Sequence, residues 1–158
     1  MTNQRSVSVT HEVGAPAQVV YAILADYRTH HPQILPRNVF TSLVIEEGGV
    51  GAGTLFRAEL KAFGRTQHVR MRVDEPEPGR ILTESDLDKE LLTTFTVSPV
   101  AAGRCLVTIA TQWRPSGGIA GWIEGMTTPP FLRRVYQDEL AQLDSYAQAL
   151  AAGKGPGM

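Results

Sequence analysis

The residues of this sequence that could transfer protons fall in two places, and Asp26 with His30 is the first. The two residues are four positions apart, a spacing that brings their side chains to one face of a helix, where a carboxylate can orient an imidazole. This is the best local acid–base pair in the chain. A surface contact between the same two side chains near a helix end is the simpler alternative.

Glu84 is the second candidate, and its role depends on which way its strand faces. Ile81 and Leu82 are both apolar, so the alternation of side chains along a strand leaves the facing open. If Leu82 faces inward, the Glu84 carboxyl enters the interior, where loss of water raises its pKa and suits it to acid catalysis or to binding a polar ligand head. Otherwise Glu84 is exposed and pairs with Arg70 or Arg72.

The remaining reactive side chains form no recognisable catalytic arrangement. His30 and His31 are adjacent, so on a helix their rings diverge by about 100° and do not readily share a metal ion. Cys105, the single cysteine, lies in an apolar strand-like segment that predicts a buried structural thiol. His11 and His68 occupy strand positions that we expect to face solvent. No Ser-His-Asp arrangement can be assembled, and we expect no metal site and no cofactor.

The glycine-rich segment 48–53 does not predict a phosphate loop. It leads into a strand rather than a helix, lacks the Lys-Ser/Thr pair of a P-loop, and does not have the spacing of a dinucleotide fingerprint. We interpret it as a flexible hairpin turn.

The elements that must position these residues are a first strand, a short helical region, a run of strands and a long helix. Ser6–Val13 alternates polar and apolar residues, and Pro16 begins a helix with apolar residues at helical spacing as far as Tyr27. Short connections between the later strands predict antiparallel pairing. Turn residues bound six of them: Val39–Glu46, Thr54–Ala62, Arg65–Asp74, Arg80–Asp86, Glu90–Ser98 and Arg104–Arg114.

The C-terminal part of the chain predicts one long amphipathic helix. From Thr128 and Pro129 to Leu150, apolar residues recur at spacings of three and four, over a length of about 30 Å that would cover the apolar face of the sheet. Residues 115–125 predict a loop with a short helical turn at 119–123. We expect a single domain over residues 1–152 and a disordered tail at 153–158.

Composition excludes several classes of protein. The chain has 158 residues with 15 Lys and Arg against 16 Asp and Glu, so it lacks the basic character of a nucleic-acid-binding protein. Its longest apolar run, residues 19–25, is too short to cross a membrane, and the first residues lack the apolar core of a signal peptide. We therefore expect a cytoplasmic protein with no nucleic-acid partner and no integral membrane association.

The order of elements and several local motifs resemble the START/Bet v 1-like (SRPBCC) superfamily, and within it the polyketide cyclase/dehydrase and lipid-transport group. The motifs are Val13-Gly-Ala-Pro16, the following segment 19–26, the Gly51-Ala-Gly53 turn, the 99–103 hairpin before Val107, and the segment 132–140. The resemblance covers about residues 6–150. It implies an α+β helix-grip fold, in which a curved seven-stranded antiparallel sheet wraps around the long helix and two short helices follow the first strand. It also places the glycine-rich turn beside a cavity entrance, where gating is a second possibility.

In such a fold, sheet and helix diverge toward one end, which leaves a cavity of ligand size unless large side chains fill it. Alternation and helical spacing place the expected lining on the inward faces of the sheet and the helix. The expected cavity residues are Tyr27, Phe56, Ala58, Met71, Phe95, Val107, Ile109, Trp113, Phe131, Leu132, Tyr136 and Leu140. Filling of an ordinary core is the alternative for each of them.

Three functions are compatible with the sequence. The first is binding of a hydrophobic small molecule, such as a lipid, an isoprenoid or an aromatic polyketide-like compound, in the cavity. The second is a cofactor-independent polyketide cyclase or dehydratase, with a tyrosine, histidine or carboxyl moving protons. The third is a protein-interaction module with a filled core and an exposed apolar patch at Ile119, Trp122 and Ile123. The chain could act as a monomer or a homodimer.

Overall fold

A seven-stranded antiparallel sheet forms the body of the molecule, in the order β1-β7-β6-β5-β4-β3-β2. The computed structural model describes residues 4–62, 64–114 and 129–153. The strands are β1 (Arg5–Val13), β2 (Phe40–Glu47), β3 (Leu55–Ala62), β4 (Arg65–Glu77), β5 (Ile81–Asp86), β6 (Leu91–Ala101) and β7 (Arg104–Trp113). The helices among these residues are α1 (Ala17–Ala25), α2 (His31–Ile34) and α4 (Pro129–Ala151).

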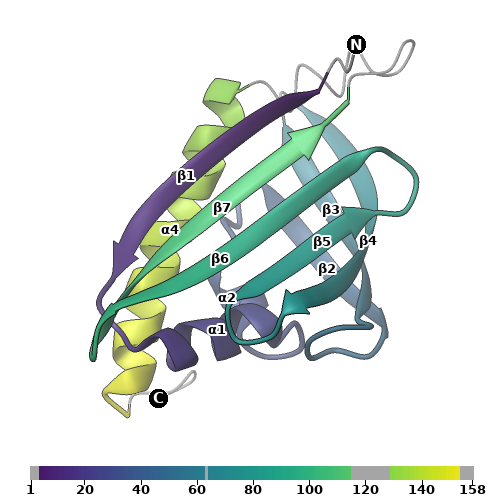
Figure 1. Cartoon of the computed structure of the whole chain (residues 1–158). Helices are drawn as coiled ribbons and strands as arrows, with labels where there is room; N and C mark the ends of the chain where they lie inside the picture. Colours follow the sequence, from purple (N-terminus) through teal and green to yellow (C-terminus); the bar gives the residue numbers. More distant parts are fainter. Residues whose placement is uncertain (1–3, 63, 115–128, 154–158) are drawn as a thin grey trace.

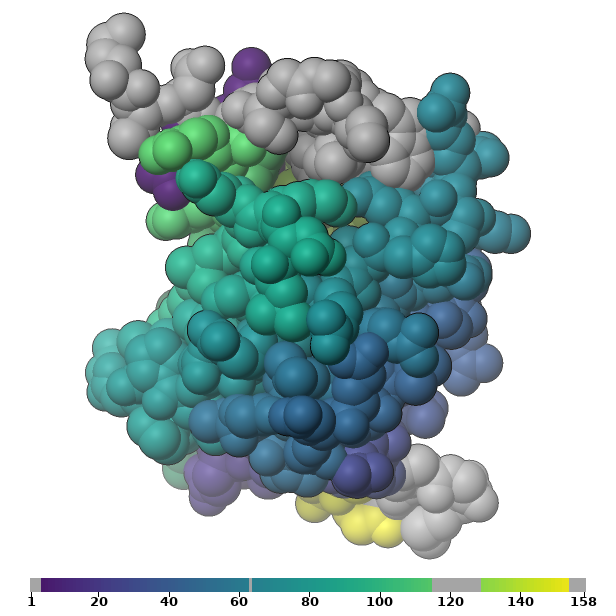
Figure 2. All heavy atoms as spheres, turned by 90° about the vertical axis from the view of Figure 1, so that its right-hand side faces the viewer, coloured from purple at the N-terminus to yellow at the C-terminus, as the bar shows by residue number. Residues whose placement is uncertain are grey.

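The sheet curves around α4, as the helix-grip prediction requires (Figure 1). The helix lies against β1, and α1 and α2 close one end of the molecule, where both contact α4. Seen from the side of β2 to β5, the sheet hides most of α4 (Figure 2). The predicted fold class is therefore confirmed, and the strand bounds differ from the predicted ones mainly in β4 and β6, which each extend three residues further.

The strands have one apolar and one polar face. Phe56, Met71 and Phe95 are buried on the inner face, whereas Arg57 and Arg70 are exposed on the outer face. This follows from the two-residue alternation of a strand whose one face is covered by a helix. Two expectations lie outside the described residues: the apolar patch at Ile119, Trp122 and Ile123 with its surrounding loop, and all but the first residue of the tail.

His11 is predicted to face solvent, and 38% of its side chain is accessible, but its ring also contacts α4. Because β1 is the edge strand beside α4, the ring of His11 lies 3.2 Å from Asp144 on that helix, through Nε2 and Oδ2. The carboxyl of Asp144 also accepts a hydrogen bond from the backbone N–H of Gly14. His68 is exposed on the outer face, with 76% of its side chain accessible.

Candidate functional site

A cavity of about 120 Å³ lies between the inner face of the sheet and the first turns of α4. Its walls are mostly apolar and aromatic, and they come from β2 to β7, α2 and α4, including Phe40, Phe56, Phe95 and Phe131. An apolar cavity of similar size, about 150 Å³, admits one benzene ring. In this conformation the cavity therefore has room for about one ring of a ligand.

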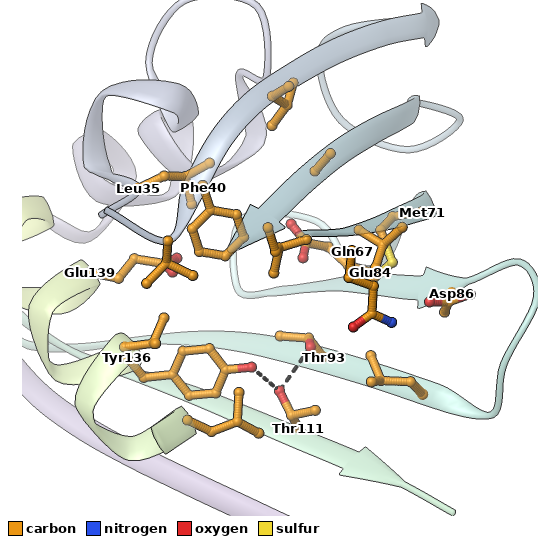
Figure 3. A pocket seen from close by; sticks show the side chains of 18 of the residues that line it. Leu35, Phe40, Gln67, Met71, Glu84, Asp86, Thr93, Thr111, Tyr136 and Glu139 are labelled. Carbon is orange, nitrogen blue, oxygen red and sulfur yellow. Dashed lines mark hydrogen bonds between the residues drawn. The ribbon is translucent and has the colours of Figure 1, made fainter. Parts of the chain in front are cut away.

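Glu84 reaches this cavity from β5 (Figure 3). Together with Tyr27 and His31 it forms a buried polar cluster. Leu82 is fully buried, so it faces inward, and Glu84, two residues further along the strand, lies on the same face. The hydroxyl of Tyr27 donates a hydrogen bond of 2.5 Å to Oε2 of Glu84. The alternative in which Glu84 pairs with Arg70 or Arg72 is not observed, because those guanidinium groups contact carboxylates on the outer face.

His31 completes the cluster from α2. Its Nδ1 lies 2.8 Å from the carbonyl oxygen of Leu24; because a carbonyl only accepts, Nδ1 of the neutral ring carries the proton. This leaves Nε2 as an acceptor, 3.8 Å from Oε2 of Glu84. The ring of His31 stacks on Tyr27 at 4.3 Å and meets the edge of Phe95 at 5.7 Å. The ring is therefore fixed both by a hydrogen bond and by aromatic packing.

Burial sets the protonation states in this cluster. Loss of water raises the pKa of Glu84 to about 7, although the hydrogen bond from Tyr27 opposes the rise. Burial lowers the pKa of His31 to about 4, against the effect of its bond to Leu24. Burial, followed by the charge of Glu84, raises the pKa of Tyr27 well above its ordinary value. At neutral pH the histidine and the tyrosine are thus uncharged, and Glu84 is divided between its acid and its carboxylate.

The cavity has a second set of polar groups on the side of α4, β6 and β7. The hydroxyl groups of Tyr136 and Thr111 are hydrogen bonded, and Thr111 bonds to Thr93 at 2.8 Å (Figure 3). Glu139, one turn after Tyr136 on α4, also lines the cavity and is 3% exposed. Gln67 lines it from β4, and its Oε1 is buried with no hydrogen-bond partner among the described residues.

The structure does not bring Asp26 and His30 together as an acid–base pair. The carboxylate of Asp26 accepts hydrogen bonds from the backbone N–H groups of Arg28 and Thr29, because the chain turns after α1 and leaves these donors to be capped. Nδ1 of His30 bonds instead to the hydroxyl of Tyr146, at 2.7 Å. Neither member of the expected pair lines the cavity.

The twelve residues expected around the cavity divide into two groups, and all but Phe131 are buried. The lining contains Phe56, Ala58, Met71, Phe95, Phe131, Leu132 and Tyr136. The others lie in the surrounding core: Tyr27, which bonds to Glu84, and Val107, Ile109, Trp113 and Leu140. The interaction-module alternative expects a filled core, whereas the structure has a cavity between sheet and helix.

Reasoning from the sequence did not identify three polar side chains that line the cavity: His31, Glu139 and Gln67. Glu139 is three residues after Tyr136, on the edge of the apolar helical stripe, and this spacing could have identified it. Gln67 has the parity of Val69 and Met71 on its strand, which could have placed it inside. The inward turn of His31 depends on its bond to Leu24, a contact that residue types do not reveal.

Among the residues that the structure describes, no group of three or more His, Cys, Asp or Glu side chains is placed to hold a metal ion. No helix in the same residues is long and apolar enough to span a membrane. The predictions of no metal, no cofactor and a cytoplasmic location stay predictions.

Fold and cavity together define a helix-grip protein with an interior site for a hydrophobic small molecule. The chain belongs to the family described as polyketide cyclase / dehydrase and lipid transport, whose model matches residues 4–148. This confirms the resemblance drawn from the sequence and supports a role in hydrophobic ligand binding or cyclisation. A search of the curated proteins found no match.

Solved structures similar to this chain share its fold over nearly their whole length. The KanY protein is 30% identical, with a TM-score of 0.79, and the match covers 92% of this chain and 98% of that one. The Zhui aromatase/cyclase from Streptomyces sp. R1128 is 22% identical, with a TM-score of 0.74 and coverage of 96% and 99%. Norcoclaurine synthase from Thalictrum flavum is 16% identical, with a TM-score of 0.71 and coverage of 95% and 98%. The last two likenesses concern the fold alone.

Proposed function

We propose that this protein is a cyclase or dehydratase that acts on a hydrophobic, polyketide-like substrate with neighbouring carbonyl groups, and that Glu84 transfers the proton. The observation that carries the proposal is the Glu84 carboxyl in the cavity wall, 13% exposed and hydrogen bonded to Tyr27. Family membership supports the substrate class.

The surroundings of Glu84 suit it to work as both a base and an acid. A group whose pKa is near the working pH both takes and returns protons efficiently, and burial raises the pKa of Glu84 to about 7. Tyr27 holds the carboxyl in place through its hydrogen bond. The neighbouring His31 ring is uncharged at this pH, so it does not pair the carboxyl with a cation. The apolar walls exclude water, which strengthens the interaction of the carboxyl with a bound carbonyl compound.

The reaction needs only proton transfers and positioning. Glu84 as carboxylate removes a proton from the carbon between two carbonyl groups, and the resulting enolate carbon forms a bond to a second carbonyl carbon of the same chain. The new alkoxide is protonated to a hydroxyl, and this leaves as water after a further proton is lost from the adjacent carbon. The cavity favours ring closure by holding the chain folded. Glu84 returns the first proton to the alkoxide and is again a carboxylate. It then takes the further proton from the adjacent carbon and gives it to the departing hydroxide, so both steps are balanced.

Carriage of a hydrophobic ligand without chemistry is the second candidate, and the mostly apolar lining of the cavity favours it. A carrier needs the cavity but has no use for a proton-transferring carboxyl. The two functions therefore differ in what Glu84 does.

The test is exchange of the α-protons of 2-indanone, a compact ketone with one aromatic ring, followed by NMR in D₂O. We expect the wild-type protein to accelerate the exchange and Glu84→Gln to lower the acceleration by a factor of about 10²–10⁴, the usual contribution of a general base. Glu59→Gln, a matched change on the outer face of β3, should leave the rate unchanged. Binding of 2-indanone without accelerated exchange, or equal rates for Glu84→Gln and wild type, would favour the carrier.

A further inference from the structure

Glu139 is a further carboxyl in the cavity, besides Glu84 and Asp86, and no partner for it is present among the described residues. It projects from α4, on the opposite wall from β5 and Glu84, and both side chains line the same space (Figure 3). Glu139 is 3% exposed. Within the described residues, its carboxyl takes part in no hydrogen bond and no ion pair, whereas Glu84 receives the hydroxyl of Tyr27.

The surroundings of Glu139 keep it protonated. An isolated carboxylate is strongly disfavoured in an apolar interior, so such a group takes up a proton instead. Burial is the main cause that raises the pKa of Glu139 well above its ordinary value, and the charge of Glu84 adds to it. A protonated carboxyl carries one O–H donor, and the donor of Glu139 has no acceptor among the described side chains. That donor is available to a ligand.

Gln67 is an independent sign that the cavity is built for a ligand with polar groups. It is 8% exposed, it lines the cavity, and its Oε1 has no hydrogen-bond partner among the described residues. A buried acceptor without a partner is unfavourable, and a bound ligand with a hydroxyl group supplies the missing donor. Gln67 on β4, Glu84 on β5 and Glu139 on α4 thus face the same space.

We propose that Glu139, as the neutral acid, donates its O–H to a carbonyl oxygen of the substrate and stabilises the negative charge that develops there when Glu84 removes a proton. This inference rests on the proposed function. The two carboxyl groups then divide the work across the cavity, with Glu84 on the strand as the base and Glu139 on the helix as the hydrogen-bond donor. Such a division arises where two carboxyl groups lie in different environments.

Only one proton moves when Glu84 deprotonates the substrate. The C–H bond of the substrate breaks, its proton passes to Glu84, and the electron pair forms the enolate, whose oxygen keeps the hydrogen bond from Glu139. Glu139 does not lose its proton in the step. The substrate class that follows is a hydrophobic ketone whose carbonyl oxygen reaches α4 while its α-carbon faces β5.

Binding of one-ring probes tests the role of Glu139 separately from that of Glu84. We would measure the affinities of 4-nitroacetophenone, which has a carbonyl acceptor, of 4-nitrotoluene, which lacks one, and of 4-nitrobenzylamine, which is a cation. In wild type we expect 4-nitroacetophenone to bind at least about tenfold more tightly than 4-nitrotoluene, the effect of one buried hydrogen bond. Glu139→Gln keeps a donor and should keep most of this preference, whereas Glu139→Leu should abolish it.

Two further variants control for effects of the substitution itself. Gln142→Leu changes an exposed position on the same helix and should keep the preference, and Glu139→Ala replaces Glu139→Leu if that variant does not fold. The proposal is overturned if wild type binds the ketone no better than 4-nitrotoluene, or if Glu139→Leu keeps the preference. It is also overturned if 4-nitrobenzylamine binds most tightly and Glu139→Gln loses that binding, since Glu139 would then be a carboxylate that pairs with a cation. Failure of 2-indanone exchange in the presence of the Glu139-dependent preference would reject the role of Glu84 as the base, and with it the stabilisation of a developing charge, but would leave Glu139 as the donor that binds the carbonyl oxygen.

Discussion

Glu84 and His31 both line the cavity wall. Their contributions to the free energy of unfolding change with pH in opposite directions. Burial raises the pKa of Glu84 from 4.5 to about 7, so its favourable contribution is complete below pH 4.5 and is lost as the pH rises through 7. Burial lowers the pKa of His31 from 6.5 to about 4, so its contribution is complete above pH 6.5 and is lost as the pH falls toward 4. Between these limits the two effects oppose each other.

Replacement of Glu84 separates its pH effect from that of His31. Relative to wild type, Glu84→Gln should gain about 3 kcal/mol in the free energy of unfolding between pH 4 and pH 8, because the cost of ionising the buried carboxyl disappears. The comparison is made by urea unfolding at several pH values, and any pH-independent effect of the substitution cancels. A difference that stays constant from pH 4 to pH 8 would mean that Glu84 is not desolvated.

His31→Gln gives the complementary prediction. Its difference from wild type should grow in the variant's favour by about 3 kcal/mol as the pH falls from 7 to 3.5, because the unfolded wild-type histidine gains a proton that the folded one does not take up. Urea unfolding over this range measures it. A histidine with an ordinary pKa in the folded protein, read from its NMR titration, would contradict both the burial of the ring and this prediction.

Among the elements, the turn between β2 and β3 positions the polar cluster. Gly49 accepts a hydrogen bond of 2.8 Å from the N–H of Tyr27, and the N–H of Gly51 donates one of 2.9 Å to the carbonyl of Ala25. The glycine-rich segment, interpreted from the sequence as a flexible hairpin, is thus bonded to the end of α1. The turn thereby fixes the backbone of Tyr27, whose hydroxyl binds Glu84.

Gly51→Ala tests this contact. Gly51 has φ of 70°, and an added Cβ would lie 2.5 Å from Oε1 of Glu75, the atom that accepts a hydrogen bond from the N–H of Ala52. We expect a loss of about 1–3 kcal/mol in the free energy of unfolding, from backbone strain and the displaced carboxylate. Gly103→Ala, where a Cβ meets nothing within 4 Å, should change stability little in the same urea titration. Equal stability of the two variants would contradict the argument.

The predictability of the elements differs from that of the site for a physical reason. Strand alternation and turn residues are local properties, so the order of strands and the inward facing of Phe56 and Met71 follow from the sequence. The facing of Glu84 did not, because Ile81 and Leu82 are both apolar. The pairing of Asp26 with His30 was inferred from spacing alone, but the turn after α1 gives Asp26 backbone donors to cap. Contacts between elements, such as His31 with Leu24, are not contained in a local pattern.

At the scale of the whole molecule, the cavity results from the geometry of a straight helix inside a curved sheet. The two surfaces meet along β1, where α4 packs closely, and they separate toward β3 and β4 on the other side. Side chains there are too small to close the gap: Ala58 occupies an inward position on β3 between Phe56 and Leu60. The site therefore depends on a small residue at this position.

Ala58→Trp should fill the cavity. Ala58 is 4% exposed and lines the cavity, whose volume of about 120 Å³ is close to that of a cavity for one aromatic ring. An indole placed there competes directly with a one-ring ligand, so we expect affinity for 4-nitrotoluene to fall at least about tenfold, or 1.4 kcal/mol. Overpacking should also cost about 1–3 kcal/mol of stability. Lys61→Trp, on the exposed face of β3, is the control. Unchanged affinity in a folded Ala58→Trp protein would show that the ligand binds elsewhere, because no one-ring molecule can share this space with an indole.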